Sequence, residues 1–262
     1  MVERIPWTTL QEMIAESVAD YRKMKSGIHM SMLATTRGGK TTLATGGKKE
    51  PGHGILGNFD DVLVIDSTAD PGILSDYGKP LGKYGAIRGH KRLTIGDMTV
   101  DSKIKIHKAL ERAMKQGNIA IYGDEIRQLA SKEFFGLGAA LNHIWFFGAK
   151  KGVSLIGGTQ QPVFVPAPFY DQAKLHFLFH IRDVRRQKRL AEIGGDTETI
   201  FQVVPSLKRH EFAFVNLDGE VVISKYEIPK AKKKTLPPED KKIHIYRGAA
   251  NGLTPTGPNA NL

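Results

Sequence analysis

The 262-residue sequence contains no cysteine, so disulfides and metal sites built from thiolates are excluded. No apolar run reaches the roughly 18 residues that a transmembrane helix needs. No apolar core follows residues 1–4, as it would in a secretory signal peptide. These absences lead us to expect a soluble, cytoplasmic protein with no membrane partner.

Acidic residues are scarce relative to basic ones. Asp and Glu number 27 against 38 Lys and Arg, which gives a formal net charge of +11. Residues 229–262 hold seven basic and two acidic residues among many Pro, Gly and Asn, and we expect them to form a flexible basic tail. Excess positive charge favours a polyanionic partner such as nucleic acid. Many basic proteins bind no nucleic acid, however, so charge alone leaves both interpretations open.

Predicted strands and helices alternate along the chain. Apolar periodicity and turn residues predict helices at 8–24, from residue 40, and at 104–114, 134–147 and 185–193, and strands at 28–33, 62–65, 84–87, 92–95, 119–122, 153–157 and 175–181. Thr8 and Gln11 match a capping box for the first helix. Asp218-Gly219 is typical of a hairpin between strands at 211–215 and 220–224. This order predicts an α/β fold with a mostly parallel sheet, flanking helices and an antiparallel edge hairpin.

A glycine-rich segment at 34–41 lies between the first predicted strand and the helix after it. Its end, Gly39-Lys40-Thr41, matches the phosphate-binding pattern G-x-x-x-x-G-K-[ST], although Ala34 replaces the first glycine. In this pattern backbone N–H groups approach the phosphates, the lysine neutralises the β- and γ-phosphates, and the hydroxyl binds Mg²⁺. A plain glycine-rich turn is the alternative. The expected ATP contacts are Thr35, Thr36, Arg37, Gly38, Gly39, Lys40, Thr41 and Thr42.

Polar residues follow two further predicted strands. Asp124-Glu125 comes directly after the strand at 119–122, and Thr159-Gln160 comes after the strand at 153–157. Because parallel strands present their carboxyl ends at one edge, these residues should lie near the phosphate loop. Asp124 would then hold Mg²⁺ together with Thr41, Glu125 would act as general base, and Gln160 would sense the γ-phosphate. The alternatives are Asp124 as a helix N-cap and Thr159-Gln160 as a simple loop start.

Over roughly residues 26–225 the chain resembles the FtsK–HerA superfamily of pumping ATPases. The resemblance is carried by the segments 34–41, 62–66, 119–125, 151–162 and 177–194. The segment Thr159-Gln160-Gln161-Pro162 is the most specific of these, because few other P-loop families have it at this place. Three features depart from the family: Ala34 replaces Gly, Gln161 replaces Arg, and Lys150-Lys151 stand where many relatives have Arg.

The resemblance implies a P-loop NTPase domain of the RecA/ASCE type at 26–228, preceded by a helix at 1–25 and followed by the tail at 229–262. It also implies a homo-oligomeric ring of about five or six subunits, with ATP at the interfaces and double-stranded DNA in a central channel. A cation acting in trans would come from Lys150, Lys151 or Arg182, or from Arg185 or Arg186. The compact, basic chain is most similar to viral genome-packaging ATPases, which implies the host cytoplasm and a portal or capsid partner.

Other functions stay open at this stage. A motor for filamentous-phage assembly, secretion or conjugative transfer has the same ATPase core, although the phage type normally carries a membrane span nearby. A degenerate nucleotide sensor is disfavoured by the intact Lys40, Thr41, Asp124 and Glu125. A nucleotide kinase would need a substrate lid, and no segment suggests one. On charge alone, the candidate DNA-contacting loops are those around 79–91 and 182–189.

Overall fold

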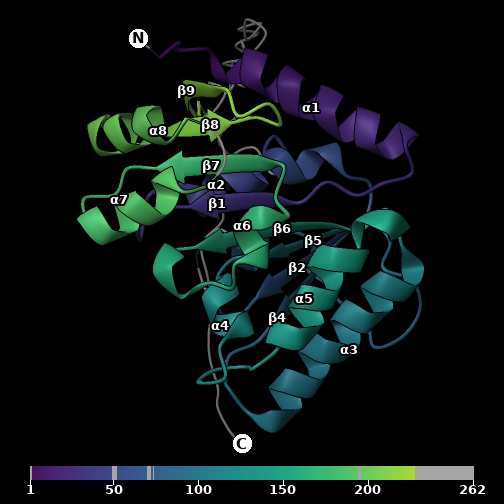
Figure 1. Cartoon of the computed structure of the whole chain (residues 1–262). Coiled ribbons are helices and arrows are strands. Elements are labelled where there is room, and N and C mark those ends of the chain that lie inside the picture. Colours follow the sequence, from purple (N-terminus) through teal and green to yellow (C-terminus); the bar gives the residue numbers. More distant parts are fainter. Residues whose placement is uncertain (1, 49–51, 70–71, 73, 194–195, 228–262) are drawn as a thin grey trace, which may run out of the picture. The chain divides into compact units, whose positions relative to one another are not determined.

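The computed structural model describes residues 2–48, 52–69, 72, 74–193 and 196–227 (Figure 1). The predicted tail at 229–262 lies outside these residues. The described residues belong to one compact unit, Met1–Pro229. No helix among them is long and apolar enough to cross a lipid bilayer.

Nine strands of the described chain form one mixed sheet. In spatial order they are β3 (Lys79–Pro80), β4 (His90–Thr94), β2 (Val62–Asp66), β5 (Ala120–Gly123), β6 (Ser154–Thr159), β1 (Met30–Leu33), β7 (Leu175–Phe179), β8 (Glu211–Val215) and β9 (Val221–Lys225). Neighbours from β3 through β7 run parallel, whereas β7–β8 and β8–β9 are antiparallel pairs. The predicted fold class is therefore confirmed.

Helices cover both faces of the sheet (Figure 1). One face packs against α1 (Trp7–Lys23) and α2 (Lys40–Thr45), and the other packs against α3 (Val100–Gln116), α4 (Ile126–Ala130), α5 (Gly138–Phe147), α6 (Pro168–Asp171), α7 (Val184–Ala191) and α8 (Thr197–Val203). Successive strand side chains point to opposite faces, so Val64 joins the α1 side and Leu63 the α3 side. Burial on both faces explains why these strands are continuous apolar runs.

Alignment of the strand ends creates the site. Leu33 at the end of β1 is in register with Thr159 at the end of β6, and Gly123 at the end of β5 is in register with Gly157. The residues that follow β1, β5 and β6 therefore meet at the carboxyl edge of the sheet, where ligands bind in open α/β sheets. β6 lies between the strand of the phosphate loop and the strand of the acidic pair.

The N-terminal segment is fixed to the hairpin edge of the sheet. Arg4 bridges to Ile223 of β9, and its guanidinium lies 2.8 Å from the Glu211 carboxylate. Trp7 is only 4% exposed and packs edge-on against Tyr226, with 4.9 Å between ring centroids. These contacts place α1 against the same core as the strands.

The start of α1 differs from the prediction. The helix begins at Trp7 after Pro6, and no side chain caps it. The predicted capping box of Thr8 and Gln11 is therefore wrong. The Gln11 amide instead donates to the His53 carbonyl at 2.8 Å, and the first helical residue, Trp7, is buried.

The predicted helix at 134–147 is too long at its start. α4 ends at Ala130, and α5 begins only at Gly138. Between them Gly136 adopts a φ of 61°, which breaks a right-handed helix. The Leu137 N–H donates to the Leu129 carbonyl at 2.8 Å, so a compact turn uses these apolar residues instead.

Two further elements differ from the prediction. Residues 84–87 form no strand, because the Ile87 N–H and carbonyl bond to the Gln116 side chain at 2.6 and 2.9 Å rather than to a neighbouring strand. Helix α8 was not predicted. Its sequence signal is Asp196, whose carboxylate caps the helix by accepting from the N–H groups of Glu198 and Thr199.

Candidate nucleotide-binding and catalytic site

The phosphate loop (residues 34–41) connects β1 directly to α2. A Cβ on Gly38 would lie 2.9 Å from the Ala34 Cβ and 3.0 Å from the Thr35 carbonyl oxygen, so this position has no room for a side chain. Gly39 has a φ of 109°, which only glycine adopts easily. Ala34 keeps an ordinary negative φ and donates its N–H to the Thr159 carbonyl at 3.2 Å. A first glycine is therefore not required for this loop.

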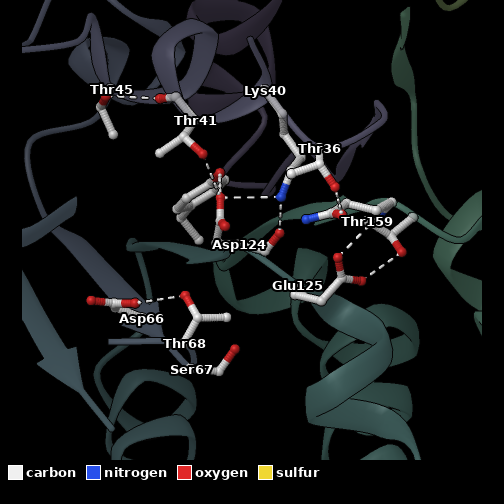
Figure 2. A network of polar contacts seen from close by, with 12 residues as sticks. Thr36, Lys40, Thr41, Thr45, Asp66, Ser67, Thr68, Asp124, Glu125 and Thr159 are labelled. Carbon is white, nitrogen blue, oxygen red and sulfur yellow. Dashed lines mark hydrogen bonds and ion pairs between the residues drawn. The ribbon is translucent and has the colours of Figure 1, made fainter. Parts of the chain in front are cut away.

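Lys40 points into the site and contacts Asp124 (Figure 2). Its Nζ lies 3.2 Å from Asp124 Oδ1 and also donates to the Asp124 carbonyl. The two side chains are 6% and 12% exposed, so the pair is nearly buried. The lysine stem passes over Gly158, where a Cβ would lie 2.5 Å from Lys40 Cδ. Sequence reasoning missed this role of Gly158.

Asp124 collects several donors on one carboxylate oxygen. Oδ1 accepts from Thr41 Oγ1 at 2.9 Å and from the Tyr122 hydroxyl at 2.6 Å. Burial alone would raise the pKa of Asp124, but the Lys40 ammonium and the two hydroxyls outweigh it and lower that pKa below its ordinary value. Burial and the neighbouring Asp124 charge raise the pKa of Tyr122 well above its ordinary value, so Tyr122 remains a donor.

Glu125 is held at the end of β6. Its Oε1 accepts from Thr159 Oγ1 at 2.7 Å, and its Oε2 accepts from the Gln160 N–H at 3.1 Å (Figure 2). Thr36 of the phosphate loop donates to Gln160 Oε1 at 2.6 Å. Glu125, not Asp124, occupies the N-cap position of α4, and it makes no side-chain cap hydrogen bond. The alternative of Asp124 as a helix cap is therefore wrong.

A cavity of about 750 Å³, the main cavity, opens between these strand ends. It is lined by all eight residues expected to contact ATP, 35–42, together with Asp124, Glu125 and Gln160. The structure thus brings together residues that are far apart in the sequence. Asp66, at the end of β2, is fully buried near this region and accepts from Thr68 Oγ1 at 3.4 Å (Figure 2).

Several cavity residues were missed by sequence reasoning. Arg127 donates to Gln161 Oε1, and its guanidinium lies 4.7 Å from the centre of the Phe164 ring. Phe134 and His210 also line the main cavity. These residues belong to no phosphate-binding pattern, and their place in the site depends on how turns pack.

The residues expected to act in trans lie at two different edges of the sheet. Lys150 and Lys151 lie in the turn Ala149–Lys151, just before β6 begins at Ser154. A six-residue strand spans roughly 15–20 Å, so they are far from the Thr159 end and outside the main cavity. Arg182 follows β7 at the carboxyl edge and lines a smaller recess with residues 35–38.

The protein oxygens fit a Mg²⁺ site completed by a nucleotide. The Thr41 hydroxyl and the Asp124 carboxylate already contact each other, and both are hard oxygen ligands of the kind Mg²⁺ prefers. Within the described residues, no group of three or more His, Asp or Glu side chains is arranged to hold a metal by itself. Mg²⁺ commonly binds through one or two protein oxygens plus substrate phosphates, which matches this donor set.

Comparison with known proteins identifies the fold. No protein-family model matches the chain, and no curated protein matches it. The DNA-packaging ATPase of Sulfolobus turreted icosahedral virus is similar, with a TM-score of 0.59 and 17% identity over 76% of this chain and 98% of that chain. The genome packaging NTPase of Sulfolobus turreted icosahedral virus 2, in complex with ATPγS, gives a TM-score of 0.61 and 16% identity over 76% and 98%. The conjugation coupling protein TcpA of pCW3 gives 0.50 and 13% over 76% and 60%.

Proposed function

We propose that the chain is a Mg²⁺-dependent ATPase that moves double-stranded DNA, as the genome-packaging motor of a virus. One observation carries this proposal: Lys40, Thr41, Asp124, Glu125 and Gln160 converge on one cavity at the carboxyl edge of the sheet. The fold shared with a viral DNA-packaging ATPase over 98% of that protein's length supports the motor assignment.

Each site residue has a role that follows from its position. Backbone N–H groups of the phosphate loop and the Lys40 ammonium bind the β- and γ-phosphates. Thr41 and Asp124 would hold Mg²⁺, which neutralises charge that develops on the phosphate oxygens. Glu125 accepts a proton from the attacking water, and its contacts with Thr159 and the Gln160 N–H fix the direction of its carboxylate.

Motor action requires more than one subunit. We assign the chain to a homo-oligomeric ring of about five or six copies with ATP at the interfaces. Lys150 and Lys151 lie at the opposite edge of the sheet from their own cavity, so they are candidates for contact with a neighbour's nucleotide. Arg182, at the carboxyl edge, is the other candidate. Double-stranded DNA and a portal or capsid protein are the partners of such a ring.

Steady-state ATP hydrolysis by the full chain tests this function directly. Rates are measured with and without double-stranded DNA at low salt, in Mg²⁺ and after chelation. We expect DNA to stimulate hydrolysis and Glu125→Gln to lower turnover by about 10²–10⁴-fold while ATP binding persists. Glu111→Gln, on the exposed surface of α3, is the matched control and should keep the wild-type rate. Full activity in Glu125→Gln would show that Glu125 is not the general base.

The same assay separates the alternative motors. The fold is also shared with a conjugation coupling protein, although that protein is matched over only 60% of its length. Hydrolysis that is vigorous but indifferent to DNA would reject the packaging assignment and favour a motor for filamentous-phage assembly or secretion. Single-stranded DNA is added as a third condition, and stimulation by single-stranded but not double-stranded DNA would favour conjugative transfer.

A further inference from the structure

The strand order indicates on which side of the phosphate loop the nucleoside lies. Asp124, Glu125, Thr159 and Gln160 follow β5 and β6, which lie on one side of β1. If the proposed function is correct, the γ-phosphate points toward these residues. The nucleoside end must then extend past β1 toward β7 and β8, which lie on the other side of β1 in the sheet (Figure 1).

A second hollow, which we call the side recess, occupies that place. Its volume is about 330 Å³, and residues 35–38 of the phosphate loop form one wall. Phe179, His180 and Arg182 at and after the end of β7 and the segment 207–211 at the start of β8 form the rest. The side recess shares residues 35–38 and His210 with the main cavity, so a ligand can extend from one into the other.

The lining of the side recess offers aromatic rings for a base as well as charge for a phosphate. His180 and His210 supply imidazole rings with polar edges, and the buried Phe179 and Leu207 lie behind them. Ligand pockets commonly combine rings with a few polar groups that fix orientation. Arg37, Arg182, Lys208 and Arg209 also line the recess and add positive charge, and His210 is itself exposed to a ligand.

His210 is held in an unusual conformation beside the phosphate loop. It ends a turn in which the Glu211 N–H donates to the Lys208 carbonyl at 3.0 Å, and its φ is 65°. This left-handed region favours glycine and asparagine, and non-glycine residues held there cluster at ligand sites. His210 Nδ1 lies 3.5 Å from the point where a Cβ on Gly39 would stand. The imidazole therefore lies directly against the phosphate loop.

The charge state of His210 favours stacking. Burial is the largest cause that lowers the pKa of His210, and the positive charges of Arg209 and Lys225 lower it further. Both influences favour the neutral imidazole over the imidazolium. A neutral aromatic ring beside the path of the nucleotide can stack on a base.

We propose that the side recess binds the nucleoside of the bound triphosphate, with the His210 imidazole stacked on the base. This inference rests on the proposed function, because it needs the γ-phosphate to point toward Glu125 and Gln160. It makes the turn before β8 the part of the protein that distinguishes a nucleotide from bare triphosphate.

Binding of ATP and of inorganic tripolyphosphate, each with Mg²⁺, tests the inference by calorimetry on the full chain. His210→Asn removes the ring but tolerates the left-handed backbone, so it should fold normally. We expect it to bind ATP about ten-fold more weakly and tripolyphosphate with unchanged affinity. His210→Phe should recover most of the ATP affinity. His107→Asn, on the exposed face of α3, is the matched control and should change neither affinity.

The possible outcomes separate this inference from the proposed function. Equal affinity of wild type and His210→Asn for ATP would overturn the nucleoside assignment alone. Equal weakening toward ATP and tripolyphosphate would also overturn it, because His210 would then act on the phosphates. Failure of the wild-type chain to bind tripolyphosphate at all would instead refute the phosphate loop, and with it the proposed function. His210→Gly, which should relieve backbone strain, is expected to be more stable than wild type and equally weak toward ATP.

Discussion

The Lys40–Asp124 ion pair makes a prediction that depends on stability rather than on activity. The pair lies in the wall of the main cavity, and both side chains are nearly buried. Lys40→Met keeps the aliphatic stem and removes the charge, and Asp124→Asn removes the opposite charge at constant size. The double variant removes both charges. We expect its loss of unfolding free energy to be clearly smaller than the sum of the losses in the two single variants.

The magnitude follows from the geometry. Two unit charges 3.2 Å apart attract by about 5 kcal/mol at an effective dielectric constant near 20. Removing one partner of a buried pair typically costs about 3–5 kcal/mol, because the other charge is left without compensation. Since the main cavity admits water to this pair, we expect about 3 kcal/mol for Lys40→Met at pH 7. We expect a coupling energy of about 2 kcal/mol between the two substitutions.

The stability cost of Lys40→Met should depend on pH. In the wild type the pKa of Asp124 is lowered, so its stabilising contribution is present above the unfolded pKa of about 3.9 and is lost as pH falls through the folded pKa. In Lys40→Met burial is no longer opposed by the ammonium, so the pKa of Asp124 should rise. The cost of Lys40→Met should then be largest at pH 7 and should shrink as pH falls toward 4.

Urea unfolding of nucleotide-free protein at pH 7 and pH 4.5 measures these quantities. The exposed pair Lys48–Asp76, at 3.4 Å and with side chains 55% and 65% exposed, provides the matched control. Lys48→Met with Asp76→Asn should show a coupling below about 1 kcal/mol. Additive single variants at Lys40 and Asp124, or a cost of Lys40→Met that does not change with pH, would refute this account of the pair.

Two further predictions concern the Glu125 carboxylate and the N-terminal helix α1. Thr159→Val keeps the side-chain volume but removes the 2.7 Å hydrogen bond to Glu125. We expect it to lower kcat by about ten-fold with little change in ATP affinity. Single-turnover kinetics that show an unchanged rate of hydrolysis would contradict this. Trp7→Ala removes a ring that packs on Tyr226 and Phe212, and should cost about 3–5 kcal/mol in urea unfolding without changing tripolyphosphate affinity. A loss below about 1 kcal/mol would mean that α1 packs only loosely.

The central strands could be predicted because local and tertiary demands agree there. The run at 62–65 is apolar without alternation, as a strand buried on both faces must be, and β2 extends only one residue further. A polar residue that directly follows such a run must lie at the carboxyl edge of the sheet, because the parallel strands all end there. Asp124 and Glu125 follow β5 in this way, so their position in the site could be inferred from sequence alone.

The turn at 131–137 could not be predicted, because its apolar residues are buried without being helical. Phe135 and Leu137 are 1% and 3% exposed, and the mostly apolar composition of residues 134–147 predicted one continuous buried helix. Gly136 decides the outcome by adopting a φ of 61°. A glycine within an apolar run is tolerated in a helix as well, so the sequence did not distinguish the two structures.

Residues that reach the site from distant turns are also beyond local patterns. His210 lies beside Gly39 only because β8 runs antiparallel to β7 and begins where β7 ends. Arg127 lines the main cavity through its contact with Gln161, which is 34 positions away. Neither residue is part of a spacing that phosphate chemistry requires, so neither could be identified before the fold was known.

Gln160 shows how far a motif can explain a site. Its side chain accepts from Thr36, its N–H donates to Glu125, and its carbonyl accepts from Arg186 at 3.3 Å. Two of these three contacts are made by the backbone and would survive any substitution that keeps the fold. The identity of the side chain therefore matters chiefly for the link to the phosphate loop. The hydrogen bond to Glu125 and the contact with Arg186 of helix α7 depend instead on the position at which β6 ends.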